Sequence, residues 1–347
     1  MSDAQSKNET AIGRVTGDKA FAERLGSLRI GIWSDSTSAK KSGYLIAEAL
    51  GDILGRLWKN LEVAGPLSNE FLHAASSSAA SGGQIILLEE KWNPPYDYVI
   101  SIGTDLPPET NVGIKVGAAG WTATVGPNAT VAEEANPVGP TAVSAIAAAE
   151  VFKFLFKDAL GEQIEFLPSN FEWSAWDYGL NYKAPSIKPI TFDDVHVFGV
   201  GAVSHGLLWL LERWPFEVSG IITLIDHDCY DDSNGQRYLG MRPNDLKQCK
   251  VIQVAERLRA RHKNLIIKSY DVHMNKYFKE FRHDCLINMG VVGLDNPEHR
   301  RQLALKLPKR VINMWTEKNH LGAACALGLP MVGLVFIVLI LRIPMLP

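Results

Sequence analysis

Cysteine is scarce in this chain of 347 residues, and its four cysteines lie far apart. None of Cys229, Cys249, Cys285 and Cys325 belongs to a C-x-x-C pair, the pattern from which structural zinc sites are usually built. Sparse, unpaired cysteine is typical of a reducing compartment. The polar N-terminus carries no signal-peptide pattern. We therefore expect a cytoplasmic protein without structural zinc.

An excess of either charge is also lacking. The chain has 35 Lys and Arg residues against 38 Asp and Glu residues, a net charge of -3. This balance argues against a broad basic surface for nucleic acid. With 46% hydrophobic and 21% charged residues the composition is that of a folded globular protein. Its length predicts two domains.

The first half alternates strand and helix patterns after a polar stretch, residues 1–19, which we expect to be a disordered tail. This alternation predicts a doubly wound α/β domain over residues 20–160, followed by a connector over 161–192. We expect helices at Tyr44–Trp58 and Thr141–Phe156, and strands at Leu28–Trp33, Gln84–Leu88, Tyr98–Ile102, Val112–Val116 and Trp121–Val125.

A glycine-rich turn opens the second half, which we expect to form a domain over residues 193–320. The apolar run ending at Phe198 leads into Gly199-Val200-Gly201-Ala202, and a helical apolar pattern follows. The N-terminus of such a helix favours phosphate, and the two glycines allow a tight turn and close approach of a ligand. Ser204 stands where the dinucleotide fingerprint usually has its third glycine. The alternative is an ordinary strand-to-helix turn.

Further motifs follow along the second half. A predicted strand, Gly220–Ile225, ends in Asp226, at the usual distance for a residue that binds ribose hydroxyls. It begins the stretch LIDHDCYDDSNGQR, and the stretches DLKQCK and LDNPEHR come later. We also expect a helix at Val251–Arg261 and strands at Ile266–Tyr270, Asp284–Gly290 and Val311–Met314.

From about Asp193 to Met314, these motifs resemble, in order and spacing, the ATP-binding domain of the ubiquitin-activating-enzyme superfamily of the ThiF, MoeB and HesA type. The resemblance implies an adenylyltransferase that uses ATP and Mg²⁺. It would activate the C-terminal carboxylate of a ubiquitin-like or sulfur-carrier protein and release pyrophosphate. It also implies a fold of two tandem Rossmann-like domains.

The same resemblance implies which residues bind ATP. Gly199, Gly201 and Ala202 would hold the phosphates through their backbone, and Asp226 would bind the ribose. Asn234 would lie against the phosphates.

Three residues would act in catalysis by the same resemblance. Arg237 and Lys250 would draw charge from the phosphates during transfer, and Asp295 would bind Mg²⁺. Arg300 matches an arginine of the family that more often orients the loop than the substrate.

Each of these residues has an ordinary structural interpretation. Asp226 could be a solvated carboxylate, and Arg237 could pair with a neighbouring aspartate on the surface. Lys250 could be an exposed helix-start residue, and Asp295 a helix N-cap. We favour function because all four occur together in the order of the family. The histidines have no metal-ligand spacing, so we interpret three of them as structural: His196, His205 and His227.

The first half resembles an inactive adenylation domain fused before an active one. Tyr98–Asp105 looks like a degenerate copy of Cys285–Asp295, but the glycine turn and its partner motifs are missing. Members of this superfamily work as pairs of such domains, so dimerisation is possible, as is a conjugating enzyme as partner. An arginine of the companion domain reaches the phosphates in the family; the candidates here are Arg14, Arg24 and Arg29.

The C-terminal segment, residues 321–347, departs from the family, and the second domain is expected to be shorter than a complete member. Leu321–Leu341 contains no charged residue and is long enough to span a bilayer. The alternatives are buried strands or an aberrant end. Cys325 lacks a neighbouring charge that would activate it, which favours a structural thiol over a thioester nucleophile.

Two other functions remain open. A nicotinamide-dependent oxidoreductase would explain the glycine turn and Asp226, but it gives Arg237, Lys250 and Asp295 no task. A catalytically incomplete relative could dock a ubiquitin-like partner without turnover.

Overall fold

The computed structural model describes residues 27–58, 60–78, 92–110, 112–160, 166–177, 183–281, 287–306, 308–317, 320–327 and 335–339. The chain divides into two compact units. The first is Met1–Ile187 together with Asp232–Asn244, and the second is Lys188–Asp231 together with Asp245–Pro347. Each unit contains its own sheet and helices, which confirms the predicted α/β class.

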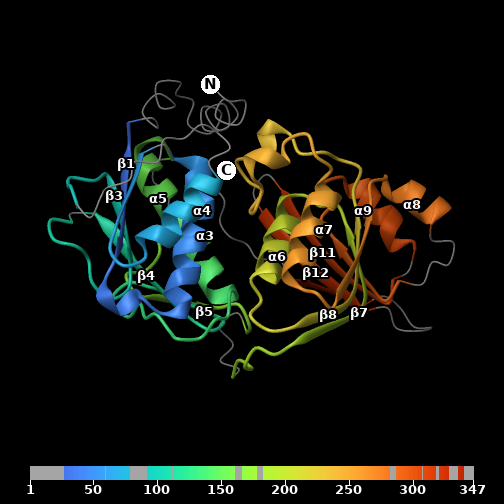
Figure 1. Ribbon diagram of the computed structural model, residues 1–347, viewed down its shortest axis with the longest axis horizontal. Helices are drawn as coiled ribbons and strands as arrows, with labels where there is room; N and C mark the ends of the chain where they lie inside the picture. The colour runs from blue at the N-terminus through green and yellow to red at the C-terminus, as the bar shows by residue number, and fades with distance from the viewer. Residues whose placement is uncertain are drawn as a thin grey trace. The chain divides into compact units, whose positions relative to one another are not determined.

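The first unit has a sheet in the order β2-β1-β3-β4-β5-β6. The pairs β4–β5 and β5–β6 are antiparallel, and the other three pairs are parallel. Helix α3 packs against α4 and α5, and Figure 1 shows these helices gathered beside the sheet. The elements are β1 (Arg29–Ser34), α3 (Lys41–Leu57), β2 (Asn60–Ala64), α4 (Ser68–Ser78), β3 (Tyr98–Ile102), β4 (Gly113–Ala119), β5 (Thr122–Val125), α5 (Val138–Leu160) and β6 (Phe171–Ser174).

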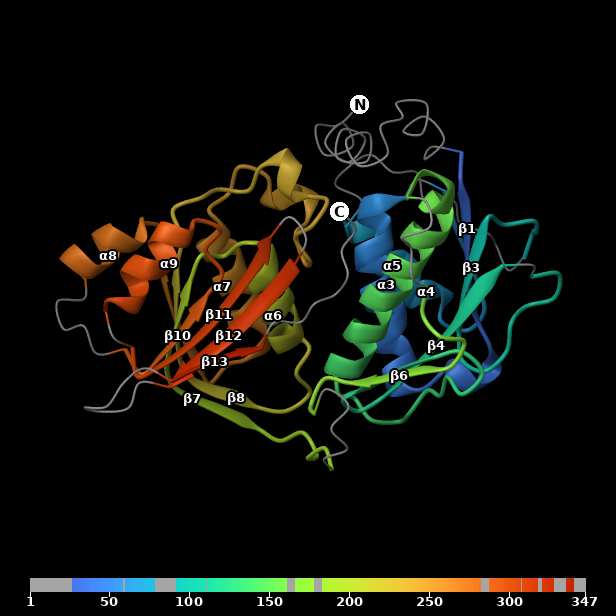
Figure 2. The ribbon, with the colours of Figure 1, turned by 180° about the vertical axis from the view of Figure 1, so that it is seen from behind.

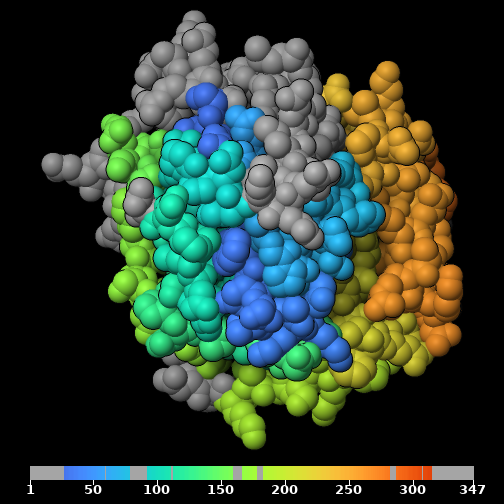
Figure 3. All heavy atoms as spheres, turned by 60° about the vertical axis from the view of Figure 1, so that its left-hand side comes forward, coloured from blue at the N-terminus to red at the C-terminus, as the bar shows by residue number. Residues whose placement is uncertain are grey.

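One apolar core holds the first unit together. It joins the buried faces of β1, β3 and β4 to α3 and α5, through side chains such as Ile30, Leu50 and Val151. Figure 3 shows early residues, in blue, and residues of the β3–β5 region, in teal, side by side on one face of this unit. The packing therefore joins segments far apart in sequence.

The second unit has a sheet in the order β13-β12-β11-β10-β7-β8-β9. The five strands from β11 to β9 are parallel, whereas β12 and β13 are antiparallel (Figure 2). The elements are β7 (Ile190–Phe198), α6 (Ala202–Glu212), β8 (Val218–Ile225), α7 (Lys250–Arg261), β9 (Leu265–Tyr270), α8 (Met274–Glu280), β10 (Met289–Val292), α9 (Pro297–Ala304), β11 (Arg310–Glu317), β12 (His320–Leu327) and β13 (Val335–Leu339).

The parallel strands of the second unit, β9-β8-β7-β10-β11, have the order of the first five strands of the dinucleotide-binding fold. The chain runs outward in one direction from β7 to β9 and then returns to the other side of β7 with β10. Ligands in open α/β sheets bind at the carboxyl ends of the strands where the order reverses. The topology therefore directs attention to the ends of β7, β8 and β10.

The two sheets share a plan. The first has β2-β1-β3-β4 followed by antiparallel β5, and the second has β8-β7-β10-β11 followed by antiparallel β12. Strand β3 thus takes the place in its sheet that β10 takes in the other. This equivalence supports the interpretation of Tyr98–Asp105 as a degenerate counterpart of Cys285–Asp295. Among the described residues of the first unit, no strand corresponds to β9.

Several predicted elements agree closely with the structure. Strand β3 has the predicted bounds, and α3 begins three residues before the predicted Tyr44. Helix α5 begins earlier than predicted because the Asn136 side chain accepts a hydrogen bond from Val138 N at its entry. The strand expected at Gln84–Leu88 lies outside the described residues. The sequence analysis missed β2, α4, β6, α8 and α9.

The uncharged stretch Leu321–Leu341 is not a spanning helix in its described part. Residues 320–327 and 335–339 form β12 and β13, which pair antiparallel with each other, and β12 pairs with β11. The strand alternative therefore holds there. Among the described residues, one helix is long and apolar enough to cross a membrane, Val138–Asp158 in α5. With 44% of its apolar window buried in the structure, it also fits a core helix.

Candidate nucleotide-binding site

The glycine turn lies between β7 and α6, at the reversal point of the second sheet. Gly199 has a φ of 83°, which a residue with a side chain adopts only with strain. A Cβ there would lie 3.0 Å from Gly293 O. Gly201 caps α6 without a side chain, so nothing from that residue covers the helix N-terminus. A helix N-terminus without a side-chain cap suits an anion.

Ser204 explains how the turn manages without a third glycine. Its hydroxyl donates to Gly199 O at 2.6 Å, and the side chain is buried. A Cβ on Gly293 would lie 2.3 Å from this hydroxyl. Gly293 N also donates to Phe198 O at 2.9 Å. Helix α6 and the segment after β10 can therefore approach closely because Gly293 lies in that segment, and no glycine is needed at position 204.

Asp226 braces the turn from the end of β8. Its Oδ2 accepts from Val200 N at 2.6 Å and its Oδ1 accepts from Asp228 N at 2.9 Å. The side chain is only 8% exposed. Burial raises the pKa of this carboxyl above its ordinary value, although these hydrogen bonds and the charge of Lys250 act in the opposite direction. Each oxygen keeps a further lone pair, so the group can still accept from a ligand hydroxyl.

Lys250 is the first residue of α7 and is buried, not exposed as its ordinary interpretation requires. Its ammonium donates to Asp228 Oδ2 at 2.9 Å, and its backbone N donates to Asp228 O at 3.1 Å. Lys250 is also close enough to Asp226 to lower that carboxyl's pKa. The structure therefore brings Asp226, Asp228 and Lys250 together at the strand edge.

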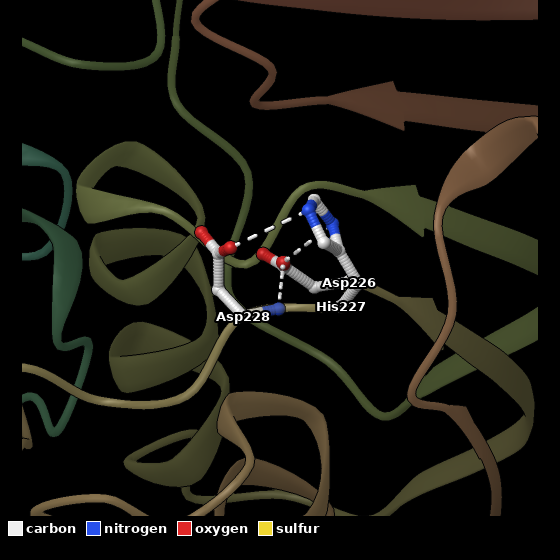
Figure 4. Close-up of side chains that lie close together, drawn as sticks. All are labelled: Asp226, His227 and Asp228. Atoms are coloured by element: carbon white, nitrogen blue, oxygen red, sulfur yellow. Dashed lines mark hydrogen bonds and ion pairs between the residues drawn. The ribbon is translucent and has the colours of Figure 1, made fainter.

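His227 lies between the two aspartates and is 59% exposed, unlike a structural core histidine. Figure 4 shows its ring beside both carboxylates: Nδ1 is 4.0 Å from Asp226 Oδ1, and Nε2 is 3.6 Å from Asp228 Oδ1. Oxygen and nitrogen atoms of the three residues lie within 4.8 Å of one another, a spacing that could hold a metal ion. Exposed acidic groups often have such spacing without a metal.

His205 is structural, as the sequence analysis expected. It is buried, and its Nδ1 donates to Gly201 O at 2.9 Å. Neutral imidazole then accepts at Nε2, from the Tyr230 hydroxyl at 2.7 Å. Arg257 donates to the same hydroxyl at 3.4 Å. The helix N-terminus is thereby tied to the segment after β8. His196 is likewise buried, 2.9 Å from the Tyr277 hydroxyl.

Two further histidines near this edge were missed by the sequence analysis. His273 begins α8 after β9, and His299 lies in α9 after β10. The His273 ring is 5.2 Å from the His227 ring and 4.8 Å from the His299 ring, between centroids. Burial, and then the two neighbouring rings, lower the pKa of His273. The sequence signal that could have predicted this cluster is that His227, His273 and His299 each follow one of the parallel strands β8, β9 and β10.

Asp295 lies in the exposed loop between β10 and α9. Its interpretation as a helix N-cap is wrong, because the neighbouring Asn296 caps α9 by accepting from Glu298 N at 2.8 Å. Asp295 thus has no capping role and remains at the carboxyl edge of the sheet. An exposed carboxylate oxygen is a suitable Mg²⁺ ligand.

Asn234 and Arg237 fall in the segment Asp232–Asn244, which belongs to the first unit. Asn234 is buried, and its carbonyl accepts from Arg237 N and Tyr238 N. The Arg237 guanidinium donates to Ser233 O at 2.8 Å and lies 5.3 Å from the centre of the Tyr238 ring. The other predicted site residues, Gly199, Gly201, Ala202, Asp226, Lys250 and Asp295, belong to the second unit.

The candidate companion arginine with a described position is Arg29. Its guanidinium holds Glu62 through contacts of 2.8 to 3.0 Å and also donates to Pro95 O. This arginine therefore serves the sheet of the first unit. Arg14 and Arg24 lie outside the described residues.

Cys229 and Cys249 face each other across an isolated antiparallel bridge, with their sulfurs 3.8 Å apart as free thiols. The Cys249 thiol donates to Asp271 Oδ2 at 3.2 Å. This hydrogen bond, together with burial and the neighbouring Cys229 thiol, raises the pKa of Cys249 to about 12. A thiol of that pKa is a poor nucleophile at neutral pH.

A cavity of about 350 Å³ lies in the second unit at the opposite edge of the sheet, where β7, β10 and β11 begin. Asp193, Asn288 and Arg310 are among its lining residues, and Asn288 donates to Asp193 at 2.8 Å. It is therefore separate from the glycine turn.

These features define an α/β protein of two units, the second with a dinucleotide-binding strand order and a glycine turn at its reversal point. Residues 54–163 match the family described as BilD N-terminal domain. Over 213 residues the chain is 26% identical to "Uncharacterized protein y4jF" of Sinorhizobium fredii, an alignment covering 60% of this chain and 40% of that protein. The chain thus spans well under two thirds of this curated relative.

Similar solved structures include Escherichia coli MccB with MccA, at 18% identity and a TM-score of 0.32, covering 38% of each chain. Another is PaaA, at 17% identity and a TM-score of 0.31, covering 38% of this chain and 40% of that one. These similarities are too low to carry an argument about function, which depends on the residues described above.

Proposed function

We propose that this protein binds ATP at the carboxyl edge of the second sheet and adenylates the C-terminal carboxylate of a ubiquitin-like or sulfur-carrier protein. The observation that carries the proposal is the grouping, at one strand edge, of a helix N-terminus without a side-chain cap, the buried Lys250, and Asp226. Together they offer anion-binding groups beside an acceptor for hydroxyl groups, the complement of a nucleotide.

The reaction needs charge dispersal more than acid–base chemistry. A carboxylate oxygen of the partner forms a bond to the α-phosphorus, and the bond from that phosphorus to the bridging oxygen breaks. The electron pair leaves with pyrophosphate, and an acyl-adenylate remains. Helix α6 and Lys250 would bind the phosphates, while Asp226 would orient the ribose. Groups held in place before the reaction stabilise developing charge most effectively.

A divalent cation fits the same proposal. Asp295 would hold Mg²⁺ at the exposed loop after β10, where the ion would reduce the negative charge of the phosphates. Asn234 and Arg237 would complete the phosphate contacts. The role of Asp295 follows from the resemblance of the LDNPEHR stretch, and that of Asn234 and Arg237 from the resemblance of the LIDHDCYDDSNGQR stretch.

Pyrophosphate exchange into ATP tests the proposal, since it requires formation of the adenylate. With a candidate partner ending in glycine, we expect exchange in the wild type. Exchange should fall by a factor of about 10² or more in Asp295→Ala and Arg237→Ala. Arg301→Ala is a matched control, because Arg301 is 77% exposed on α9. Exchange in both test variants at the control rate would refute the site assignment.

Absence of exchange in the wild type, combined with tight binding of the partner, would favour the alternative of a binding protein without turnover. Dimerisation and contact with a conjugating enzyme remain predictions of the resemblance. Size-exclusion chromatography with light scattering checks the first of these.

A further inference from the structure

The segment Asp232–Asn244 comes from the middle of the second half in sequence, yet its contacts place it in the first unit. It leaves the second unit after β8 and returns before α7. It also carries Asn234 and Arg237. The residues of the first unit that hold this segment therefore bear on the proposed nucleotide site.

Two charged residues of α3 make these contacts. Arg56 Nη1 donates to Gly235 O at 2.9 Å, and its Nη2 donates to Met241 O at 2.8 Å. Asp52 Oδ2 accepts from Gly240 N at 2.8 Å. The guanidinium and the carboxylate therefore grip the segment near both of its ends.

The two residues also hold each other. Arg56 Nη2 lies 2.9 Å from Asp52 Oδ1, and both side chains are at most 1% exposed. Arg242, itself on the segment, adds a contact of 2.7 Å to the same carboxylate oxygen. Burial alone would raise the pKa of Asp52, but Arg56 and Arg242 outweigh it and lower this pKa. The carboxylate is thus charged at neutral pH, and the network is ionic.

Stability by itself does not explain a buried ionic network, because removing charges from water costs free energy. Two charges removed from water need close geometry and further hydrogen bonds, and well-packed apolar residues often do as well or better. The charged groups fix geometry instead, because the planar guanidinium can donate only to carbonyl oxygens that lie in certain positions around it. The network therefore suits a part whose backbone position matters.

We propose that Asp52 and Arg56 are positioning residues that fix Asp232–Asn244, and through it Asn234 and Arg237, for binding of the nucleotide phosphates. The inference rests on the proposed function for its consequence, but the anchoring itself does not. Gly235 follows Asn234 directly and precedes Arg237 by two residues, so release of its carbonyl would free both. In this proposal Asp52 and Arg56 of α3 determine where the backbone of Asn234 and Arg237 lies within the first unit.

Hydrogen exchange of the 347-residue chain, without nucleotide, tests the anchoring independently of activity. In Arg56→Gln we expect the amides of 232–244 to exchange about tenfold faster or more. Amides of β1 and β3 should keep their protection. Arg56→Lys should be intermediate, since an ammonium cannot reach all three oxygens in the planar geometry. Protection of 232–244 as in the wild type in Arg56→Gln would overturn the proposal.

Arg213→Gln is the matched control. Arg213 is a half-buried arginine that follows α6 in the second unit, whereas the segment tested belongs to the first. Its guanidinium lies 3.6 Å from the centre of the Trp209 ring of the same unit. It should leave exchange of 232–244 unchanged. If Arg56→Gln loses protection throughout the first unit, Arg242→Gln decides: faster exchange confined to the segment supports the anchor, and unchanged exchange overturns it.

The consequence for activity is read from pyrophosphate exchange kinetics. Arg56→Gln should raise the KM for ATP about tenfold, with partial rescue in Arg56→Lys. A wild type that shows no exchange would refute the proposed function and leave the hydrogen-exchange result to decide the anchor. Conversely, a loosened segment with an unaltered KM would refute the positioning role while adenylation stood.

Discussion

Single residues at the glycine turn have distinct tasks that their neighbours in space determine. Gly199 needs its positive φ and lies against the backbone at Gly293, whereas Gly206 lies in α6 with open space around the position of a Cβ. Ser204 fills the space that Gly293 leaves. Glycine is therefore required at position 199, whereas another residue can replace it at position 206.

Alanine at these two glycines should have opposite effects. Gly199→Ala should lower the free energy of unfolding by about 1–3 kcal/mol, because its φ is unfavourable and its Cβ meets backbone. Gly206→Ala should raise it by up to about 1 kcal/mol, since alanine suits a helix interior. Urea unfolding monitored by tryptophan fluorescence measures both. Equal changes would contradict this account.

The buried Asp226 gives a prediction about pH. Its folded-state pKa is raised above the ordinary 3.8. The group therefore contributes stability below the unfolded-state value, and this contribution is lost as pH rises through the folded-state value. Asp226→Asn has no such titration. Its free energy of unfolding, relative to the wild type, should increase with pH above 3.8 and then level off. Urea unfolding between pH 4 and 8 measures the difference; a constant or falling difference would contradict it.

At the scale of elements, α7 begins in an unusual way. Lys250 is its first residue, where the helix dipole disfavours a cation, and its side chain is buried. Asp228, half exposed, is its ion-pair partner. A local conflict of this kind is expected at functional sites, where stability is given up for an electrostatic task. Under the proposed function, the task of Lys250 at this edge is to attract an anion.

Lys250→Met should separate stability from function. Methionine fills a similar volume without the charge, and Asp228 can be solvated, so the free energy of unfolding should change by no more than about 1 kcal/mol. Binding of ATP, measured by isothermal titration calorimetry, should weaken by a factor of about 10². Lys263→Met, at an exposed lysine after α7, is the control. Unaltered ATP affinity in Lys250→Met would remove Lys250 from the site.

At the scale of the whole molecule, the two units share a strand order but contain different functional features. The second has the glycine turn and the extra strand β9, while the first supplies the buried pair that holds Asp232–Asn244. Within the first unit, Asp52 and Arg56 of α3 thus hold a segment that carries two of the proposed site residues, Asn234 and Arg237.

A nucleotide should stabilise the full chain selectively. ATP with Mg²⁺ at 100 times its Kd should stabilise by about 2.7 kcal/mol, a rise in Tm of several degrees for a protein of this size. NAD at the same concentration should leave Tm unchanged. Differential scanning fluorimetry measures both. A rise with NAD and none with ATP would favour the oxidoreductase alternative.

The order of strands β7 to β11 with helices α6 and α7, the glycine turn at Gly199 and the bounds of β3 followed from the sequence, because propensity and periodicity act over a few neighbouring residues. Helices α8 and α9 did not follow from it. Only the tertiary structure decided that Lys250 is buried, that Arg29 holds Glu62, that Asp232–Asn244 joins the first unit and that 320–327 is strand. These outcomes depend on partners far away in the sequence, and a short apolar run looks the same in a buried strand as in a buried helix.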